Sequence, residues 1–135
     1  MIKFRAWEKE EKVMCCVLEM KFDSEELIKV GIGYPDGLNS SLRFPSMIEL
    51  MRCTGLKDKN GKYIYEGDVF NCHYSDETKN HHKWQVVWNN ESAGFVLSRI
   101  GEPCNQKMVH QRVSDYSGWR GEIIGNIYEN KELLK

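Results

Sequence analysis

The chain contains 135 residues, of which 41% are hydrophobic and 29% are charged. This size fits one soluble domain with a single hydrophobic core. The 19 Lys and Arg residues nearly balance the 20 Asp and Glu residues, so the formal net charge is -1 and provides no strong attraction to nucleic acid or to an anionic membrane. The frequent aromatic residues and the balanced charge exclude an intrinsically disordered chain.

Charged residues are spread through the first ten positions, which is not typical of a secretion signal. The longest uninterrupted apolar run, residues 13–18, has six residues, whereas a membrane-spanning helix needs about 20. The five cysteines include the adjacent pair Cys15 and Cys16 and form no C-x-x-C motif, which argues against a disulfide framework or a redox site. We therefore expect a cytoplasmic protein with reduced cysteines.

Short alternating segments predict strands in the N-terminal half. Residues 2–6 alternate apolar and basic side chains, and residues 12–20 are rich in β-branched and sulfur-containing side chains, so we expect two strands joined by a turn at 8–11. Ser24 precedes acidic residues and is expected to cap a helix of about two turns. The Gly-, Pro- and Ser-rich stretch 31–46 is expected to be an irregular surface connection between an N-terminal β subregion and a C-terminal β core.

The C-terminal half is expected to be mainly β as well. Asn60-Gly61 predicts a hairpin turn, because Asn-Gly tolerates the positive φ angles that such a turn requires. Alternating apolar residues further along predict a strand at 70–74, a hairpin that pairs 84–88 with 95–97, and a strand at 121–128 before a short helical turn at 129–135.

Three stretches carry a resemblance to known proteins: KFRAW at 3–7, TGLKDKNGKYIYEGDV at 54–69, and GNIYEN at 125–130. Together they resemble the YopX family of small proteins from temperate bacteriophages and prophages. The central block is the most specific because it matches over sixteen consecutive residues. Two departures are mild: Glu8 stands where members commonly have Asp, and Lys131 stands where they commonly have Pro.

The resemblance implies one domain over residues 1–135, mainly β, with a small barrel-like (SH3-like) core, additional strands and one or two short helices. It also implies an origin in a phage or prophage. It carries over no catalytic, cofactor-binding or metal-binding residue. Gly67-Asp68 is expected to form a tight bend similar to the first turn of SH3-like barrels, but such a likeness of fold does not establish function.

Histidine and cysteine are densest at Cys72-His73 and His81-His82. Neighbouring strand residues point to opposite faces, so Cys72 and His73 cannot both bind one ion without a bulge. The usual spacing of zinc ligands is also missing. We therefore expect no metal site, and we expect His81 and His82 to be solvated loop residues.

Motifs for catalysis and for cofactors are also missing. The glycines at 31, 33 and 37 do not have the spacing of a dinucleotide-binding loop. The segment 58–61 lacks the glycine and glutamate positions of a calcium loop, and the sequence contains no G-x-S-x-G. We expect a protein that is not an enzyme and that needs no cofactor.

One stretch, 107–120, combines positive charge with aromatic side chains, a pattern that suits binding to phosphates and stacking on bases or on a partner. The alternative is that its aromatic residues cover the core and its arginines are solvated charges. The candidate residues for binding a partner or nucleic acid are Lys107, His110, Arg112, Tyr116, Trp119 and Arg120.

We expect a non-catalytic accessory protein of a phage or prophage. The leading class is a protein interaction module with an unknown partner or with a second copy of itself, because small β domains often need a partner to cover edge strands. The alternative is a nucleic-acid-binding accessory protein, which should lose affinity steeply as salt rises.

Overall fold

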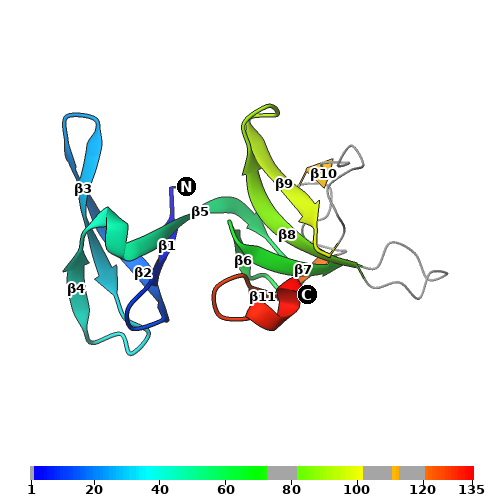
Figure 1. The fold of residues 1–135 in the computed structure, drawn as a ribbon, viewed down its shortest axis with the longest axis horizontal. Coiled ribbons are helices and arrows are strands. Elements are labelled where there is room, and N and C mark those ends of the chain that lie inside the picture. Colours follow the sequence, from blue (N-terminus) through cyan, green and yellow to red (C-terminus); the bar gives the residue numbers. More distant parts are fainter. Residues whose placement is uncertain (1, 73–81, 102–110, 113–120) are drawn as a thin grey trace. The chain divides into compact units, whose positions relative to one another are not determined.

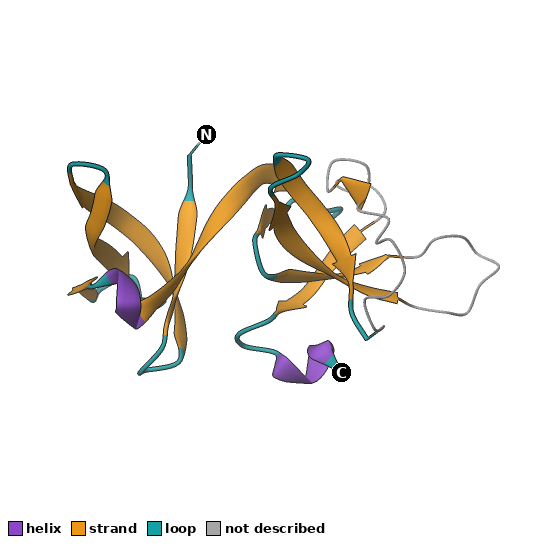
Figure 2. Cartoon of the chain, turned by 45° about the horizontal axis from the view of Figure 1, so that its top comes forward, coloured by secondary structure: helices purple, strands orange, loops and turns teal. Residues whose placement is uncertain are grey.

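The structure is a computed structural model, and it describes residues 2–72, 82–101, 111–112 and 121–135. In these residues strands predominate, and the helical elements are two short 3-10 turns (Figure 2). The chain divides into two compact units, Met1–Cys53 (unit 1) and Thr54–Lys135 (unit 2). Strand β5, Ile48–Lys57, begins in unit 1 and ends in unit 2 (Figure 1). The expected mainly β fold is therefore confirmed.

Unit 1 is an antiparallel sheet with the strand order β4-β3-β2-β1-β5. The expected first hairpin is confirmed, because β1 pairs with β2 across a tight turn. Alternation along the strands places one apolar set on one face, where Ala6, Cys15, Val30, Ile32 and Ile48 pack together. The elements are β1 (Phe4–Glu8), β2 (Val13–Asp23), β3 (Glu26–Gly33), β4 (Ser40–Arg43) and the 3-10 turn η1 (Pro45–Met47).

In unit 2, β6 pairs with β5, and a second sheet has the order β10-β9-β8-β7-β11. The core of unit 2 contains Ile64, Phe70, Val86 and Leu97. The expected hairpin is confirmed, since Val86 faces Leu97 across β8 and β9. The elements are β6 (Tyr63–Tyr65), β7 (Asp68–Cys72), β8 (His82–Asn89), β9 (Gly94–Arg99), β10 (Gln111–Arg112), β11 (Gly121–Asn126) and the 3-10 turn η2 (Lys131–Leu134).

The two sheets are open in the part of the chain that the structure describes. Strands β10 and β11 stand at opposite ends of the sheet order in unit 2, and no described ladder joins them. The barrel-like core that the family resemblance implied is therefore not formed by these residues.

The expected helix after Ser24 is wrong. Ser24 has a φ of 55° and lies in the turn between β2 and β3. The segment that follows is a strand in which Val30 and Ile32 are fully buried. Their spacing has the two-residue period of a strand, and pairing with β2 outweighs the helix-capping signal at Ser24.

The expected irregular connection at 31–46 is also wrong for most of its length. Gly31 and Gly33 belong to β3, and residues 40–43 form β4. The loop at 34–39 and residue 44 are irregular, residues 45–46 belong to η1, and Asp36 holds the loop by accepting hydrogen bonds from the backbone of Leu38 (2.8 Å) and Asn39 (2.9 Å). The division between the two units falls inside β5.

Two smaller expectations also change. His82, expected in a loop, lies in β8, where it faces Cys72 in the ladder. The last strand ends at Asn126 and not at Tyr128, because the Asn126 side chain accepts the backbone N–H groups of Tyr128 (3.0 Å) and Glu129 (2.9 Å). The short helical turn expected near the C-terminus is confirmed at η2.

Candidate protein-binding site

The binding residues predicted from the sequence lie almost entirely outside the described residues. This applies to Lys107, His110, Tyr116, Trp119 and Arg120. Arg112 lies in β10, at the edge of the sheet in unit 2, and its backbone pairs with Val96. The role proposed for this stretch therefore remains a prediction.

The histidine and cysteine residues weighed as metal ligands are only partly described, since His73 and His81 lie outside the described residues. Where the structure describes the chain, it brings together no group of three or more His, Cys, Asp or Glu side chains that could hold an ion. In the same residues, no helix is long and apolar enough to cross a membrane.

The central block of the family pattern forms a turn organised by Asp58. This carboxylate is 4% exposed. Its Oδ1 accepts the backbone N–H groups of Asn60 and Lys62, both at 2.9 Å, and its Oδ2 accepts that of Ile123 at 3.2 Å. Gly61 takes the positive φ that the turn requires, 79°. These residues tie the β5–β6 turn to β11, which is a structural role.

The remaining family residues close turns in the same way. Asp68 Oδ2 accepts the backbone N–H of Tyr65 at 2.8 Å. Asn126 caps the turn after β11 and donates from Nδ2 to Glu129 at 2.8 Å. The side chain of Asn130 in turn accepts the Asn126 N–H at 3.1 Å. These polar groups satisfy one another and thereby stabilise the turns.

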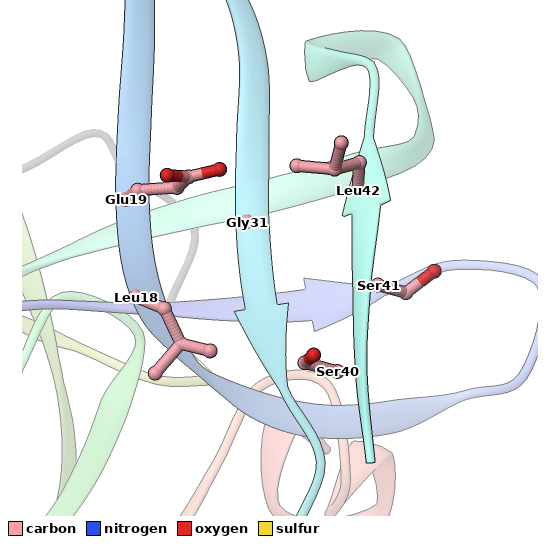
Figure 3. Close-up of a pocket in the computed structure, with 6 residues that line it drawn as sticks. All are labelled: Leu18, Glu19, Gly31, Ser40, Ser41 and Leu42. Carbon is pink, nitrogen blue, oxygen red and sulfur yellow. The ribbon is translucent and has the colours of Figure 1, made fainter.

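A groove of about 500 Å³ lies over β2, β3 and β4 in unit 1 (Figure 3). Two buried glycines, Gly31 and Gly33, shape this face of β3, because they have no side chains and β2 side chains occupy the space above them. A Cβ added at Gly31 would lie 2.6 Å from Glu19 Cγ, and one added at Gly33 would lie 2.7 Å from Cys16 Sγ. Side chains of β2 therefore lean over β3. The lining consists of Leu18, Glu19, Gly31, Ser40, Ser41 and Leu42.

The walls of the groove are apolar and exposed. Leu18 is 62% exposed on the β2 side, and Leu42 is 56% exposed on the β4 side. Glu19 supplies the one charged group among the lining residues, and its carboxylate lies beside Gly31 (Figure 3). Apolar walls with a single anionic group suit a ligand that combines an apolar portion with a cation or a hydrogen-bond donor.

A buried polar cluster holds β4 in place from the opposite face. The fully buried Glu8 carboxylate accepts Arg43 Nε at 3.3 Å and the Glu11 backbone N–H at 2.6 Å. Arg43 also donates to the Tyr34 hydroxyl at 2.9 Å and to Ser41 Oγ. The cluster thus joins the end of β1 to β4, which forms one side of the groove.

Two titratable side chains in and beside this cluster, Tyr34 and Cys15, have raised pKa values. Burial raises the pKa of the Cys15 thiol above its ordinary 9.0, and the neighbouring Cys16 and Glu8 act in the same direction. Partial burial also raises the pKa of Tyr34 above 10.0, against the opposing charge of Arg43. A thiol and a phenol with raised pKa values stay protonated near neutral pH, so neither is an activated nucleophile or base.

A family model described as YopX protein matches residues 3–135, which is essentially the whole chain. The chain belongs to the YopX family. The resemblance seen in the three motifs is thereby confirmed, and it extends from β1 to the C-terminal turn. A search of curated proteins found no match to this YopX chain.

A solved structure supports the fold. The crystal structure of protein EF1440 from Enterococcus faecalis is 26% identical in sequence, with a TM-score of 0.64. The match covers 100% of this YopX chain and 99% of the EF1440 chain. The likeness therefore includes both units and indicates a shared fold.

Sequence reasoning missed the groove because it interpreted Gly31, Gly33 and Ser40 as signals of a loop. One signal was present in the YopX chain: Val30 and Ile32 alternate with the two glycines. Glycines on one face of a strand allow neighbouring groups to approach that surface closely. That surface becomes a groove only when the flanking Leu18 and Leu42 are known to be its neighbours, and the register of β2 and β4 was not predictable.

Proposed function

We propose that this YopX-family protein is a non-catalytic interaction module of a phage or prophage, and that it binds a protein partner or a second copy of itself in the bacterial cytoplasm. The observation that carries the proposal is the groove between Leu18 and Leu42 beside the edge strand β4. Exposed apolar side chains around a concave surface are typical of sites that bind other molecules. An adjacent strand edge adds backbone groups that a partner can use.

The polar cluster supports the non-catalytic part of the proposal. Glu8 is fully buried and is bonded to Arg43 and to a backbone N–H, so it has no access to a substrate. The Cys15 thiol is buried and has a raised pKa. The cluster has a structural role, since it holds β4 beside the groove. A catalytic role is not needed to account for these residues.

The alternative function, a nucleic-acid-binding accessory protein, depends on the basic and aromatic residues of 107–120 and makes no use of the groove. The two proposals therefore differ in which substitutions abolish binding. They also differ in salt dependence, because binding to phosphates weakens steeply as salt rises and apolar packing does not.

The proposed function is tested by recovering the tagged protein from lysogenic cells, with and without nuclease. We compare the wild type with the double variant Leu18→Ser, Leu42→Ser, which removes both apolar walls. The matched control is Ile2→Ser, since Ile2 is 91% exposed and does not line the groove. We expect the wild type to recover one protein in stoichiometric amount, either a different protein or a second, differently tagged copy of this chain. Its recovery should not depend on nuclease treatment and should be lost only in the double variant.

Two outcomes would overturn the proposed function. One is that the wild type recovers no protein that survives nuclease treatment. The other is that the double variant, shown to be folded by its circular dichroism spectrum and melting temperature, recovers the same partner as the wild type. A third outcome would also contradict it: if Ile2→Ser loses the partner and the double variant keeps it, the partner binds a different surface.

A further inference from the structure

No described strand covers the edge of unit 1 at β4, and one carbonyl on that side, Leu42 O, accepts Arg43 Nη1 at 3.2 Å. Strand β4 is the last strand in the sheet order and pairs only with β3. Just before β4, the Tyr34 N–H donates to Asn39 O at 3.0 Å, so Tyr34 and Asn39 form a hydrogen-bonded pair. Antiparallel pairs alternate between bonded and non-bonded residues, so Ser41 bonds toward β3. The N–H groups of Ser40 and Leu42 therefore point to the open side.

A path leads from this edge into the groove. Across the sheet, Ser40 is level with Gly33, and Leu42 is level with Gly31. In this row β4 contributes only the small Ser40 side chain, and Gly33 beyond it is covered by Cys16 and Leu18 of β2. A long side chain from a strand added beside β4 lies over Ser40 and ends beside this cover, between Leu42 and Leu18.

The end of this path is anionic. Glu19 is level with Gly31, and its Oε1 is 3.3 Å from the position that a Cβ on Gly31 would occupy, so the carboxylate lies above β3 and not above its own strand. An added strand is about 10 Å from β3, because strands are spaced by about 4.8 Å. Only a long side chain crosses most of that distance, and Arg and Lys are the long side chains with an apolar stem and a cationic end.

We propose that β4 accepts an extended segment of a partner protein as an added strand, and that one Arg or Lys side chain of this segment enters the groove over Ser40 and pairs with Glu19. This inference rests on the proposed function and names the chemistry of the partner. Backbone hydrogen bonds to an edge strand supply affinity, and a side-chain site beside it supplies specificity. Strand β4 has four residues, so the groove contact carries much of the selectivity.

A second charged row limits the partner further. Lys21 and Lys29 face each other one row beyond Glu19 and Gly31 on the same face, and both are exposed. They repel a segment that carries several cations. The partner segment therefore has a single basic residue flanked by neutral or acidic residues.

The probe is a short peptide of alternating Thr and Val with Arg at its centre, titrated into the full-length protein and followed by NMR. Matched peptides carry Met, Glu or a run of Arg at the same place. We expect the single-Arg peptide to bind most tightly and to shift the amide signals of Ser40 and Leu42. Glu19→Gln should weaken it about tenfold, which corresponds to about 1.4 kcal/mol. The control Glu25→Gln, in the β2–β3 turn, should have no effect.

Two further variants separate the parts of the inference. Glu19→Lys should reverse the preference, so that the Glu peptide binds better than the Arg peptide. Ser40→Pro should abolish binding of every peptide, because it removes an N–H on the open side and leaves the bonds to β3 intact. The melting temperature of each variant confirms that it is folded.

The inference is overturned if no peptide binds, or if Glu19→Gln and Glu19→Lys bind the Arg peptide as the wild type does. If the peptide tests fail but the wild type recovers a partner that the double variant Leu18→Ser, Leu42→Ser does not recover, the proposed function stands. Only the strand-addition mode then fails. When the wild type recovers no partner, the proposed function fails, whichever peptide binds.

Discussion

Single residues at turns determine much of this fold, and Gly61 is the clearest example. Its φ is 79°, and a Cβ added there would have no other atom within 4 Å. A substitution at this position therefore tests backbone conformation without any change in packing. The neighbouring Asp58 has the opposite role, since it acts only through its side-chain oxygens.

Gly61→Val should destabilise unit 2 by about 1–2 kcal/mol, because a β-branched residue strongly disfavours the left-handed region. Gly61→Asn should cost less, since Asn tolerates positive φ. The free energy of unfolding is measured by denaturant titration with tryptophan fluorescence in a Trp7→Phe background, in which every remaining tryptophan belongs to unit 2. Equal stability of the Val variant and the wild type would contradict the turn.

Asp36 should make the loop before β4 sensitive to acid. Hydrogen bonds from the Asn39 and Leu38 backbone lower the pKa of its carboxyl below the ordinary 3.8. A carboxyl with a lowered pKa in the folded state contributes stability above its unfolded pKa and loses it as pH falls through the folded pKa. The amide signals of Leu38 and Asn39 should therefore shift with a midpoint below pH 3.8.

Asp36→Asn is the control for this loop. Its amide oxygen still accepts the backbone N–H groups but does not titrate in this range, so the acid-dependent shift should disappear while the loop stays folded. A midpoint at or above 3.8 in the wild type would contradict the hydrogen bonds assigned to Asp36.

Among the elements, β4 depends most on a side-chain cluster. It has four residues and pairs with one described strand, so its ladder alone is short. Arg43 compensates by joining β4 to Glu8 at the end of β1 and to Tyr34 at the end of β3. Arg43 also bonds to Ser41, which lines the groove, so loss of the cluster should disturb the β4 side of the groove.

Arg43→Met should destabilise unit 1 by about 3–5 kcal/mol, because it leaves the fully buried Glu8 carboxylate without its counter-charge. Combining it with Glu8→Gln should recover part of this loss, since the uncompensated charge is then removed. Hydrogen exchange at β4 measures the local effect. The cluster assignment is wrong if the single variant protects β4 amides as well as the wild type.

Strands with a clear alternation of apolar and polar residues were predictable from the sequence. Strands whose composition is typical of a loop were not. The hairpin of β8 and β9 was predictable because Trp84, Val86 and Trp88 alternate cleanly. The strands β3 and β4 were not, because Gly31, Gly33 and two serines have the composition of a loop. Pairing with β2 satisfies the backbone of β3 and outweighs that local preference.

At the scale of the whole molecule, the two units contain different candidate binding regions. Unit 1 has the groove beside β4, which the structure describes fully. Unit 2 contains the stretch 107–120, of which the structure describes only Gln111 and Arg112. The net charge of -1 favours the first surface, because a chain without excess positive charge gains little from binding phosphates. An experiment on salt dependence separates the two surfaces.

We expect the wild type not to bind single-stranded or double-stranded DNA or RNA at about 50 mM salt, where non-specific attraction to phosphates is strong. The titration is repeated at several salt concentrations with the double variant Arg112→Ala, Arg120→Ala, whose stability should change by no more than about 0.5 kcal/mol. If the wild type does bind a duplex, each ionic interaction with a phosphate that the variant removes should lower the slope of log affinity against log salt by about 0.9. Such a change in slope would assign nucleic-acid binding to 107–120 and favour the alternative function. If instead this stretch touches the protein partner, the double variant should weaken partner recovery while nucleic-acid binding stays at background.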